Sequence, residues 1–228
     1  MDLLEELKKL SSKEKVATYQ RFFKTGKGHY GEGDIFLGIT VPETRRVARQ
    51  FIHISPDEIE KHLRSKYHEE RLAALMILVD NYQKKRSKEI VRFYLKNLRY
   101  ANNWDLVDLT ADKILGSYLF DKNKSILYKL LKSSNLWERR IAIVSTFHFI
   151  KNNEFSDTLR ISKLLLNDKH DLIHKAVGWM LREVGKRDEK TLESFLKAHY
   201  KIMPRTALRY AIERFPEEKR LRYLKGKI

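Results

Sequence analysis

Apolar residues recur along the chain at the spacing of amphipathic helices. Between residues 69 and 82 they fall on Leu72, Leu75, Met76 and Val79, positions that share one face of a helix. The same spacing returns after residue 88 and again between residues 173 and 184. No segment alternates apolar and polar residues over several positions, as a half-buried strand would. The pattern predicts an all-α protein.

Capping and helix-breaking residues separate these apolar segments. Ser55-Pro56-Asp57-Glu58 combines a capping serine, a first-turn proline and first-turn acids, which together are typical of a helix start. Val41-Pro42-Glu43 and Met203-Pro204 indicate two further starts, and Asn102-Asn103 and Ser133-Ser134-Asn135 are short polar connectors. We therefore expect helices of about 12 residues joined by short turns.

The helical segments repeat about every 35 residues, a period typical of helix-pair repeats. Glu70–Leu75 aligns with Arg139–Val144, 69 positions later, and Trp104 lies about halfway between them; His174 and Ala207 continue the series. Helix pairs of roughly 35 to 45 residues are typical of TPR, HEAT and armadillo repeats. Because the TPR pattern is missing, we predict HEAT-like repeats in a single domain over residues 1–228, stacked into a curved solenoid with a basic concave face. An irregular helical bundle is the alternative.

The charge balance indicates a polyanionic partner. Lys and Arg total 47 against 30 Asp and Glu, a formal charge of +17, and such an excess favours nucleic-acid binding over a generally cationic surface. Cysteine is absent, which excludes disulfides and thiolate sites and fits a reducing cytoplasm. No apolar run approaches the roughly 20 residues that cross a bilayer. We expect a cytoplasmic protein without membrane contact.

Several motif-like strings support no specific chemistry. Residues 26–31 spell G-x-G-x-x-G, but a dinucleotide site needs a preceding strand, so we expect a glycine-rich loop that either offers N–H groups to a phosphate or is only mobile. His170 and His174 have zinc-protease spacing, yet the acid between them is Asp rather than Glu and no third ligand is evident. Walker and nucleophile-elbow motifs are missing. We expect neither a metal nor a cofactor.

The tryptophans at 104, 137 and 179 each lie near charged residues in a repeat segment. Core packing is the ordinary explanation for any single one. However, Asp108 follows Trp104 by four residues, on the same helix face, within an apolar run where a buried carboxylate is costly. Gly178 precedes Trp179 in mid-helix, where glycine costs about 1 kcal/mol relative to alanine and lets another backbone approach closely. From spacing alone, structural and functional interpretations of these tryptophans both stay open.

Together these segments resemble the AlkD-type DNA alkylation-repair glycosylases, a family of HEAT-like repeat proteins. The resemblance covers most of the chain. Any one of its blocks is modestly specific, whereas several in the same order are highly specific. The blocks are residues 24–34, residues 36–45, Asn103–Asp108, Trp137–Arg140 and Lys175–Glu183.

The resemblance implies a reaction centre. It makes Asp108 the catalytic carboxylate, Trp104 and Trp179 the active-site aromatic residues, and Arg140 a phosphate contact. The further DNA-binding candidates are Tyr19, which matches a family tyrosine more weakly, and Arg45, Lys175 and Arg182.

The implied activity is hydrolysis of the N-glycosidic bond of cationic N3- or N7-alkylated purines in double-stranded DNA. We expect a monomer that works without metal or small-molecule cofactor. A non-catalytic module that binds damaged or branched DNA is the main alternative, and a HEAT scaffold for an acidic protein is a second one.

Overall fold

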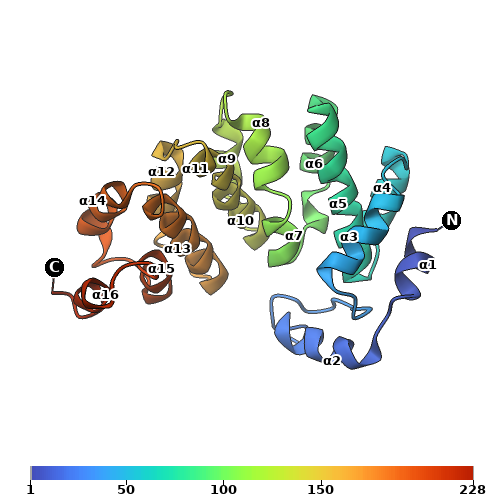
Figure 1. Cartoon of the computed structure of the whole chain (residues 1–228), viewed down its shortest axis with the longest axis horizontal. Helices are drawn as coiled ribbons and strands as arrows, with labels where there is room; N and C mark the ends of the chain where they lie inside the picture. The colour runs from blue at the N-terminus through green and yellow to red at the C-terminus, as the bar shows by residue number, and fades with distance from the viewer. Residues whose placement is uncertain (1, 228) are drawn as a thin grey trace. The chain divides into compact units, whose positions relative to one another are not determined.

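The computed structural model of the chain describes residues 2–227 (Figure 1). Within this range the secondary structure is helical, and the one β-type pairing is an isolated bridge between Ile35 and Tyr67. The prediction of an all-α protein is confirmed. The chain divides after Thr110 into two compact units, called here the N-terminal unit and the C-terminal unit. The expectation of one domain over residues 1–228 stays a prediction.

The helices of the two units have the following bounds. The N-terminal unit contains α1 (Leu3–Lys8), α2 (Lys13–Phe22), α3 (Val41–Gln50), α4 (Pro56–Leu63), α5 (His68–Lys85), α6 (Lys88–Lys96), the 3-10 turn η1 (Leu98–Tyr100) and α7 (Trp104–Asp108). The C-terminal unit contains the π-helical turn η2 (Asp112–Gly116), α8 (Ser117–Leu119), α9 (Ser125–Leu130), α10 (Leu136–Ser145), α11 (Phe147–Lys151), α12 (Ser156–Leu165), α13 (Asp171–Gly185), α14 (Glu189–His199), α15 (Arg205–Ala211) and α16 (Glu217–Leu224). Most of them are shorter than the predicted length of about 12 residues, whereas α5 has 18 residues and α13 has 15.

The predicted helix starts are present. Ser55 caps α4 in a reciprocal capping box with Glu58, and Thr40 caps α3 in the same way one residue before Val41. Asn103 and Asn135, from the two predicted polar connectors, cap α7 and α10 with their side-chain oxygens. Each cap satisfies a backbone N–H that has no partner inside its helix.

The core of the N-terminal unit is built around α5. Its residues 68–79 are all buried, and a helix that is apolar on every side must be covered on every side. It packs against α1, α3, α4, α6 and α7, and Figure 1 shows α4, α5 and α6 beside one another. Because α5 is enclosed, the charged residues of its first turn are buried as well.

The predicted repeat is present in the positions of the helices. Five helices that begin 32 to 36 residues apart continue the series, with first residues at His68 in α5, Trp104 in α7, Leu136 in α10, Asp171 in α13 and Arg205 in α15. Between them lie the second helices of each pair, such as α9 before α10 and α12 before α13. The HEAT-like repeat is therefore confirmed, while the curved solenoid with its basic concave face stays a prediction.

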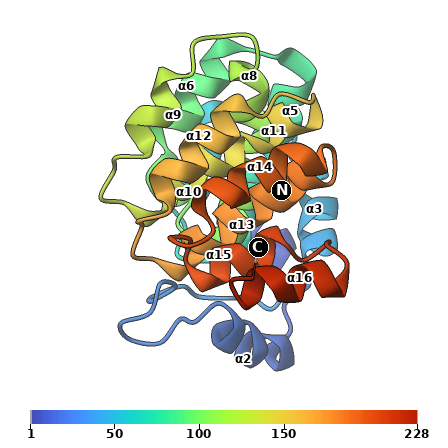
Figure 2. The same cartoon turned by 90° about the vertical axis from the view of Figure 1, so that its left-hand side faces the viewer.

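The C-terminal unit is organised around α13, which packs against α10, α11, α12, α14 and α15. Helices α13 and α15 lie side by side (Figure 2), and Gly178 lies at their contact. A Cβ atom on Gly178 would stand 2.5 Å from the carbonyl oxygen of Ala207 and 2.5 Å from Cβ of Tyr210. The mid-helix glycine thus serves the close approach of another backbone, as predicted.

Among the helices of residues 2–227, none combines the length and the apolar character needed to span a membrane.

Candidate active site

The predicted catalytic pair lies on one short helix of the N-terminal unit. Trp104 is the first and Asp108 the last residue of α7. The side chain of Asn103 caps this helix by accepting the N–H of Trp104 at 2.9 Å. Leu106 and Val107 are fully buried and anchor α7 in the core, while Trp104 and Asp108 are half-buried on its exposed side.

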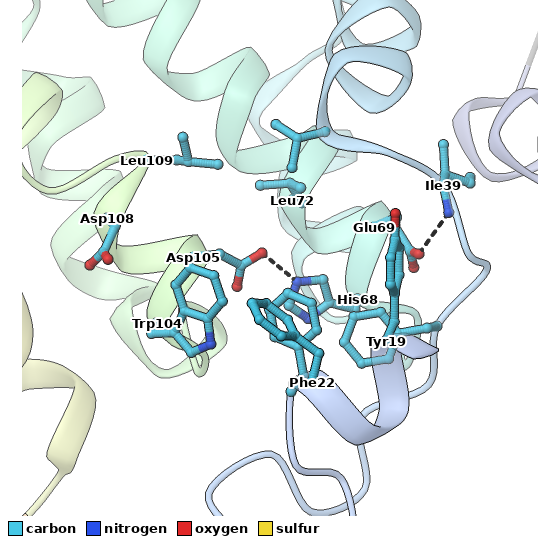
Figure 3. A pocket seen from close by; sticks show the side chains of 13 residues that line it. Tyr19, Phe22, Ile39, His68, Glu69, Leu72, Trp104, Asp105, Asp108 and Leu109 are labelled. Atoms are coloured by element: carbon cyan, nitrogen blue, oxygen red, sulfur yellow. Dashed lines mark hydrogen bonds and ion pairs between the residues drawn. The ribbon is translucent and has the colours of Figure 1, made fainter. Parts of the chain in front are cut away.

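Both residues line a cavity of about 350 Å³ whose walls are mainly apolar (Figure 3). Predicted site residue Tyr19 reaches the same cavity from α2, and Phe22 lies at its edge with 62% of its surface exposed. A cavity of this size is within the range of small-ligand sites. The structure therefore brings together three of the predicted residues. The complete lining is Tyr19, Phe22, Phe23, Phe36, Ile39, Val41, His68, Glu69, Leu72, Trp104, Asp105, Asp108 and Leu109.

Aromatic neighbours fix the indole of Trp104. Its ring stacks on that of Phe23, with centroids 5.2 Å apart and planes 11° apart, and the edge of Phe22 meets it at 5.7 Å. Phe23 in turn stacks on Phe36 at 4.8 Å. Such contacts contribute about 0.5–1.5 kcal/mol each beyond burial, so the orientation of the indole is set before any ligand binds.

A buried cluster of polar side chains, Asp34, His68, Arg71, Asn103 and Asp105, lies beneath α7. His68 bridges two carboxylates, with Nδ1 at 3.0 Å from Oδ2 of Asp34 and Nε2 at 2.8 Å from Oδ2 of Asp105. Asp34 also accepts hydrogen bonds from Arg71 and, at 2.9 Å, from Asn103. Figure 3 shows Asp105 directed toward His68 and Asp108 directed away from it.

Asp34 and His68 shift each other's pKa, and the charge of Asp105 raises the pKa of His68 further. Burial alone would lower the pKa of His68, but the charge of Asp105 and the hydrogen bonds to Asp105 and Asp34 outweigh it and raise the pKa to about 9. Burial alone would raise the pKa of Asp34, but the hydrogen bond from His68 and the charge of Arg71 lower it to about 2. At neutral pH His68 is therefore an imidazolium and Asp34 is ionised.

A further buried acid, Glu69, holds the loop segment that lines the cavity. Glu69 accepts the backbone N–H groups of Leu37 at 2.9 Å, Gly38 at 2.8 Å and Ile39 at 3.2 Å. These bonds fix the chain between the glycine-rich loop and α3.

Burial, and to a smaller extent the charges of Glu69 and Glu43, raise the pKa of Tyr19, so its phenol is protonated at neutral pH.

The glycine-rich loop of residues 24–34 lies outside any helix. Two of its N–H groups are already bonded within the loop, that of Gly28 to the Glu32 carboxylate at 2.7 Å and that of Gly31 to the carbonyl of Lys24 at 3.3 Å. A Cβ on Gly31 would stand 2.3 Å from the carbonyl oxygen of Phe23. Gly31 therefore lets the loop pack against the backbone of Phe23, and the end of the loop places Asp34 in the buried cluster.

Predicted residues Arg140 and Trp179 belong to the C-terminal unit. Arg140, on α10, is buried and donates to the carbonyl of Leu172 at the start of α13. Trp179, on α13, is half-buried with its ring 5.6 Å from that of Phe147. The third tryptophan, Trp137, has only 8% of its surface exposed, as core packing requires.

The remaining DNA-binding candidates lie on separate helices. Arg45 is half-buried on α3. On α13, Lys175 pairs with Asp171 at 3.0 Å, and Arg182 pairs with Glu213 and, at 3.5 Å, with Glu183. Each cation of α13 thus has a carboxylate partner within its own unit.

The two histidines with zinc-protease spacing serve the turn before α13. His170 accepts the N–H of Leu172 at 3.1 Å, and Nε2 of His174 donates to the carbonyl of Asp168 at 2.5 Å. Within residues 2–227, no group of three or more His, Cys, Asp or Glu side chains is arranged to hold a metal ion.

The comparison with known proteins decides the family. A family model described as DNA alkylation repair enzyme matches residues 3–215. The chain belongs to this family. As a member of the DNA alkylation repair enzymes, it has the fold of two bacterial structures, each at 20% identity. A predicted DNA alkylation repair enzyme from Enterococcus faecalis aligns over 91% of this chain and 97% of its own, with a TM-score of 0.74. AlkD2 from Streptococcus mutans aligns over 90% and 99%, with a TM-score of 0.60. No curated protein matches the sequence significantly.

Sequence reasoning did not identify the buried cluster. Its one local signal is the run His68-Glu69-Glu70-Arg71 at the start of a helix whose next eight residues are apolar. When an apolar stretch of helix is enclosed on every side, the polar residues that directly precede it are buried with it, and buried charges need partners. The partners Asp34 and Asp105 are more than thirty residues away, so the sequence does not show the pairing.

Proposed function

We propose that this protein is a DNA N-glycosylase that removes cationic N3- or N7-alkylated purines from double-stranded DNA. The observation that carries this proposal is the placement of Trp104 and Asp108 on one short helix beside an aromatic-walled cavity. Membership of the DNA alkylation repair enzymes supplies the biological context. The formal charge of +17 suits a polyanionic substrate.

The chemistry needs one carboxylate. Alkylation at N3 or N7 makes the purine cationic, so the C1′–N bond breaks with its electron pair leaving on the base, which departs neutral. The sugar becomes oxocarbenium-like, and the ionised Asp108 stabilises its positive charge. Water then adds to C1′ and gives its proton to Asp108. Ordinary glycosidases need a second carboxyl group to protonate the leaving group, a step that the cationic base makes unnecessary.

Trp104 supplies a face for positive charge. A cation over an indole ring is stabilised by about 0.5–2 kcal/mol. Because Phe23 and Phe22 hold the ring, little of this stabilisation is lost to reorganisation when the cationic nucleotide arrives. Tyr19, on the opposite helix of the cavity, is the further aromatic contact from the N-terminal unit. The roles predicted for Trp179, Arg140, Arg45, Lys175 and Arg182 in holding DNA stay predictions.

The direct test is an excision assay on duplexes with defined lesions. Wild-type protein should release 7-methylguanine or 3-methyladenine from methylated DNA, and Asp108→Asn should lower the single-turnover rate by about 10²-fold or more. The asparagine keeps the shape of the side chain but removes the charge and the proton acceptor. DNA affinity, measured by fluorescence anisotropy, should change little.

Asp121→Asn is the matched control, because it makes the same substitution at an exposed carboxylate whose ion-pair partner within residues 2–227 is Lys122. It should leave excision unchanged. Affinity should fall steeply with salt through counterion release in both variants and the wild type. Wild-type protein that binds DNA but releases no base would instead be the non-catalytic binding module, and protein whose excision survives Asp108→Asn would remove Asp108 from its role.

A further inference from the structure

We propose that His68, in its protonated form, is a positioning residue that sets the orientation of α7 and so of Trp104 and Asp108. The imidazolium bridges the two carboxylates of the buried cluster, and α7 depends on both of them. The activity measurement below rests on the proposed glycosylase function, whereas the structural measurements do not.

Helix α7 has little means of fixing its own orientation. It is five residues long, far below the roughly 12–15 residues at which isolated helices become stable in water. Both sequence neighbours of Trp104 join the buried cluster: Asn103 donates to Asp34 at 2.9 Å, and Asp105 accepts a hydrogen bond from Nε2 of His68 at 2.8 Å. His68 therefore contacts one of these neighbours directly and reaches the other through Asp34.

The proton on His68 is what makes the bridge complete. An imidazolium donates from both ring nitrogens, whereas a neutral imidazole donates from one and presents a lone pair on the other. Asp34 has further donors in Arg71 and Asn103. For Asp105 the second oxygen, Oδ1, is buried and meets no donor within residues 2–227. Loss of the proton thus leaves one carboxylate facing a lone pair, in a place where water does not compensate.

Ring contacts supply a second link to Trp104. The imidazole of His68 stacks on Phe36 with centroids 4.5 Å apart and lies 5.0 Å from the ring of Phe23. Phe23 is the ring on which Trp104 stacks. A displacement of His68 would therefore be transmitted both through the backbone of α7 and through the face of the indole.

The charged surroundings of His68 are defined on every side. Asp34 faces it from the loop before α3, Asp105 from α7, and Arg71 from its own helix α5 through Asp34. Glu69 is bonded to the backbone of residues 37–39. Asp108 and Tyr19 line the same cavity as His68. The two carboxylates in direct contact balance the imidazolium and the guanidinium, so deprotonation leaves the cluster with an excess negative charge.

The experiment follows three signals between pH 6.5 and 9.5. The first is the NMR titration of the His68 imidazole, assigned with His68→Gln. The second is fluorescence of Trp104 in the Trp137→Phe/Trp179→Phe protein, where it is the single tryptophan. The third is the single-turnover excision rate of the wild type. All three should share a midpoint near the His68 pKa of about 9, and the rate should fall in proportion to the protonated fraction of His68 if only the protonated form is competent.

The variant Asp105→Asn tests the cause. It removes the charge that contributes most to raising the His68 pKa, so the NMR and fluorescence midpoints should move together to lower pH. Quenching by the phenolate of Tyr19, which lines the same cavity as Trp104, does not interfere in this pH range, because the pKa of Tyr19 is raised above its ordinary value of 10. Should Asp105→Asn fail to fold, coincidence or separation of the two midpoints in the protein with Asp105 intact still decides the question.

His62→Gln is the matched control. His62 is also buried in the N-terminal unit and pairs with a carboxylate, Glu70, at 2.7 Å, but between α4 and α5. It should lower stability without moving any midpoint. A Trp104 signal that stays flat while His68 titrates, a His68 midpoint near 6.5, or a midpoint shifted by His62→Gln would each overturn the positioning role. Wild-type protein without excision would refute the proposed function alone, because the NMR and fluorescence midpoints would still decide the role of His68.

Discussion

Replacing Gly178 with alanine should destabilise the C-terminal unit, although alanine is the better helix former. The helix-propensity gain is about 1 kcal/mol. Against it, the new Cβ would stand 2.5 Å from the carbonyl oxygen of Ala207, whereas ordinary contacts begin at 3.4 Å. The obstacle is backbone, so α13 and α15 must separate by close to an ångström. Overpacking of this kind costs about 1–3 kcal/mol, and we expect its upper end, for a net loss of about 1–2 kcal/mol.

The matched control is Gly185→Ala, at the last residue of the same helix. Its Cβ would meet Cδ2 of Leu192 at 2.3 Å, the end of a flexible side chain that can change rotamer. This variant should be within about 1 kcal/mol of the wild type. Urea unfolding followed by circular dichroism gives both values. If Gly178→Ala proved as stable as Gly185→Ala, the close approach of α13 and α15 would not be the reason for the glycine.

Three further results are expected. The free energy of unfolding should be highest between about pH 4 and 6.5. Above this range the contribution of His68, about 3 kcal/mol, is lost as the pH rises toward the folded-state pKa of about 9, and below it the contribution of Asp34 is lost as the pH falls toward a pKa of about 2. A flat pH profile in thermal melts would contradict this. Glu69→Gln should cost about 1.5–3 kcal/mol in urea unfolding, because an amide group cannot accept on both sides, and an unchanged midpoint would show the three N–H bonds to be dispensable. Arg140→Ala should weaken anisotropy-measured binding to unrelated DNA sequences equally; a loss confined to one sequence would mean that Arg140 contacts bases.

The helical class, the repeat and most of the helix starts can be predicted from the sequence alone. These features are local: the apolar spacing of residues 72–79 and the caps at Ser55, Asn103 and Asn135 act over one or two turns, so they can be read without knowing the fold. The spacing of Trp104 and Asp108 also follows from helix geometry alone. Their assignment as a reaction centre came from family resemblance rather than from periodicity.

Which charged residues are buried, and what each one contacts, depends on how the helices and loops pack together. The apolar run predicts that Asp108 is its costly buried acid, yet Asp108 is half-buried at a cavity while Asp105 is enclosed. The loop bearing Asp34, the start of α5 and the start of α7 meet through contacts that span more than thirty residues. A charge can be buried only where a partner is brought to it, and that partner is a product of packing, which no local pattern records.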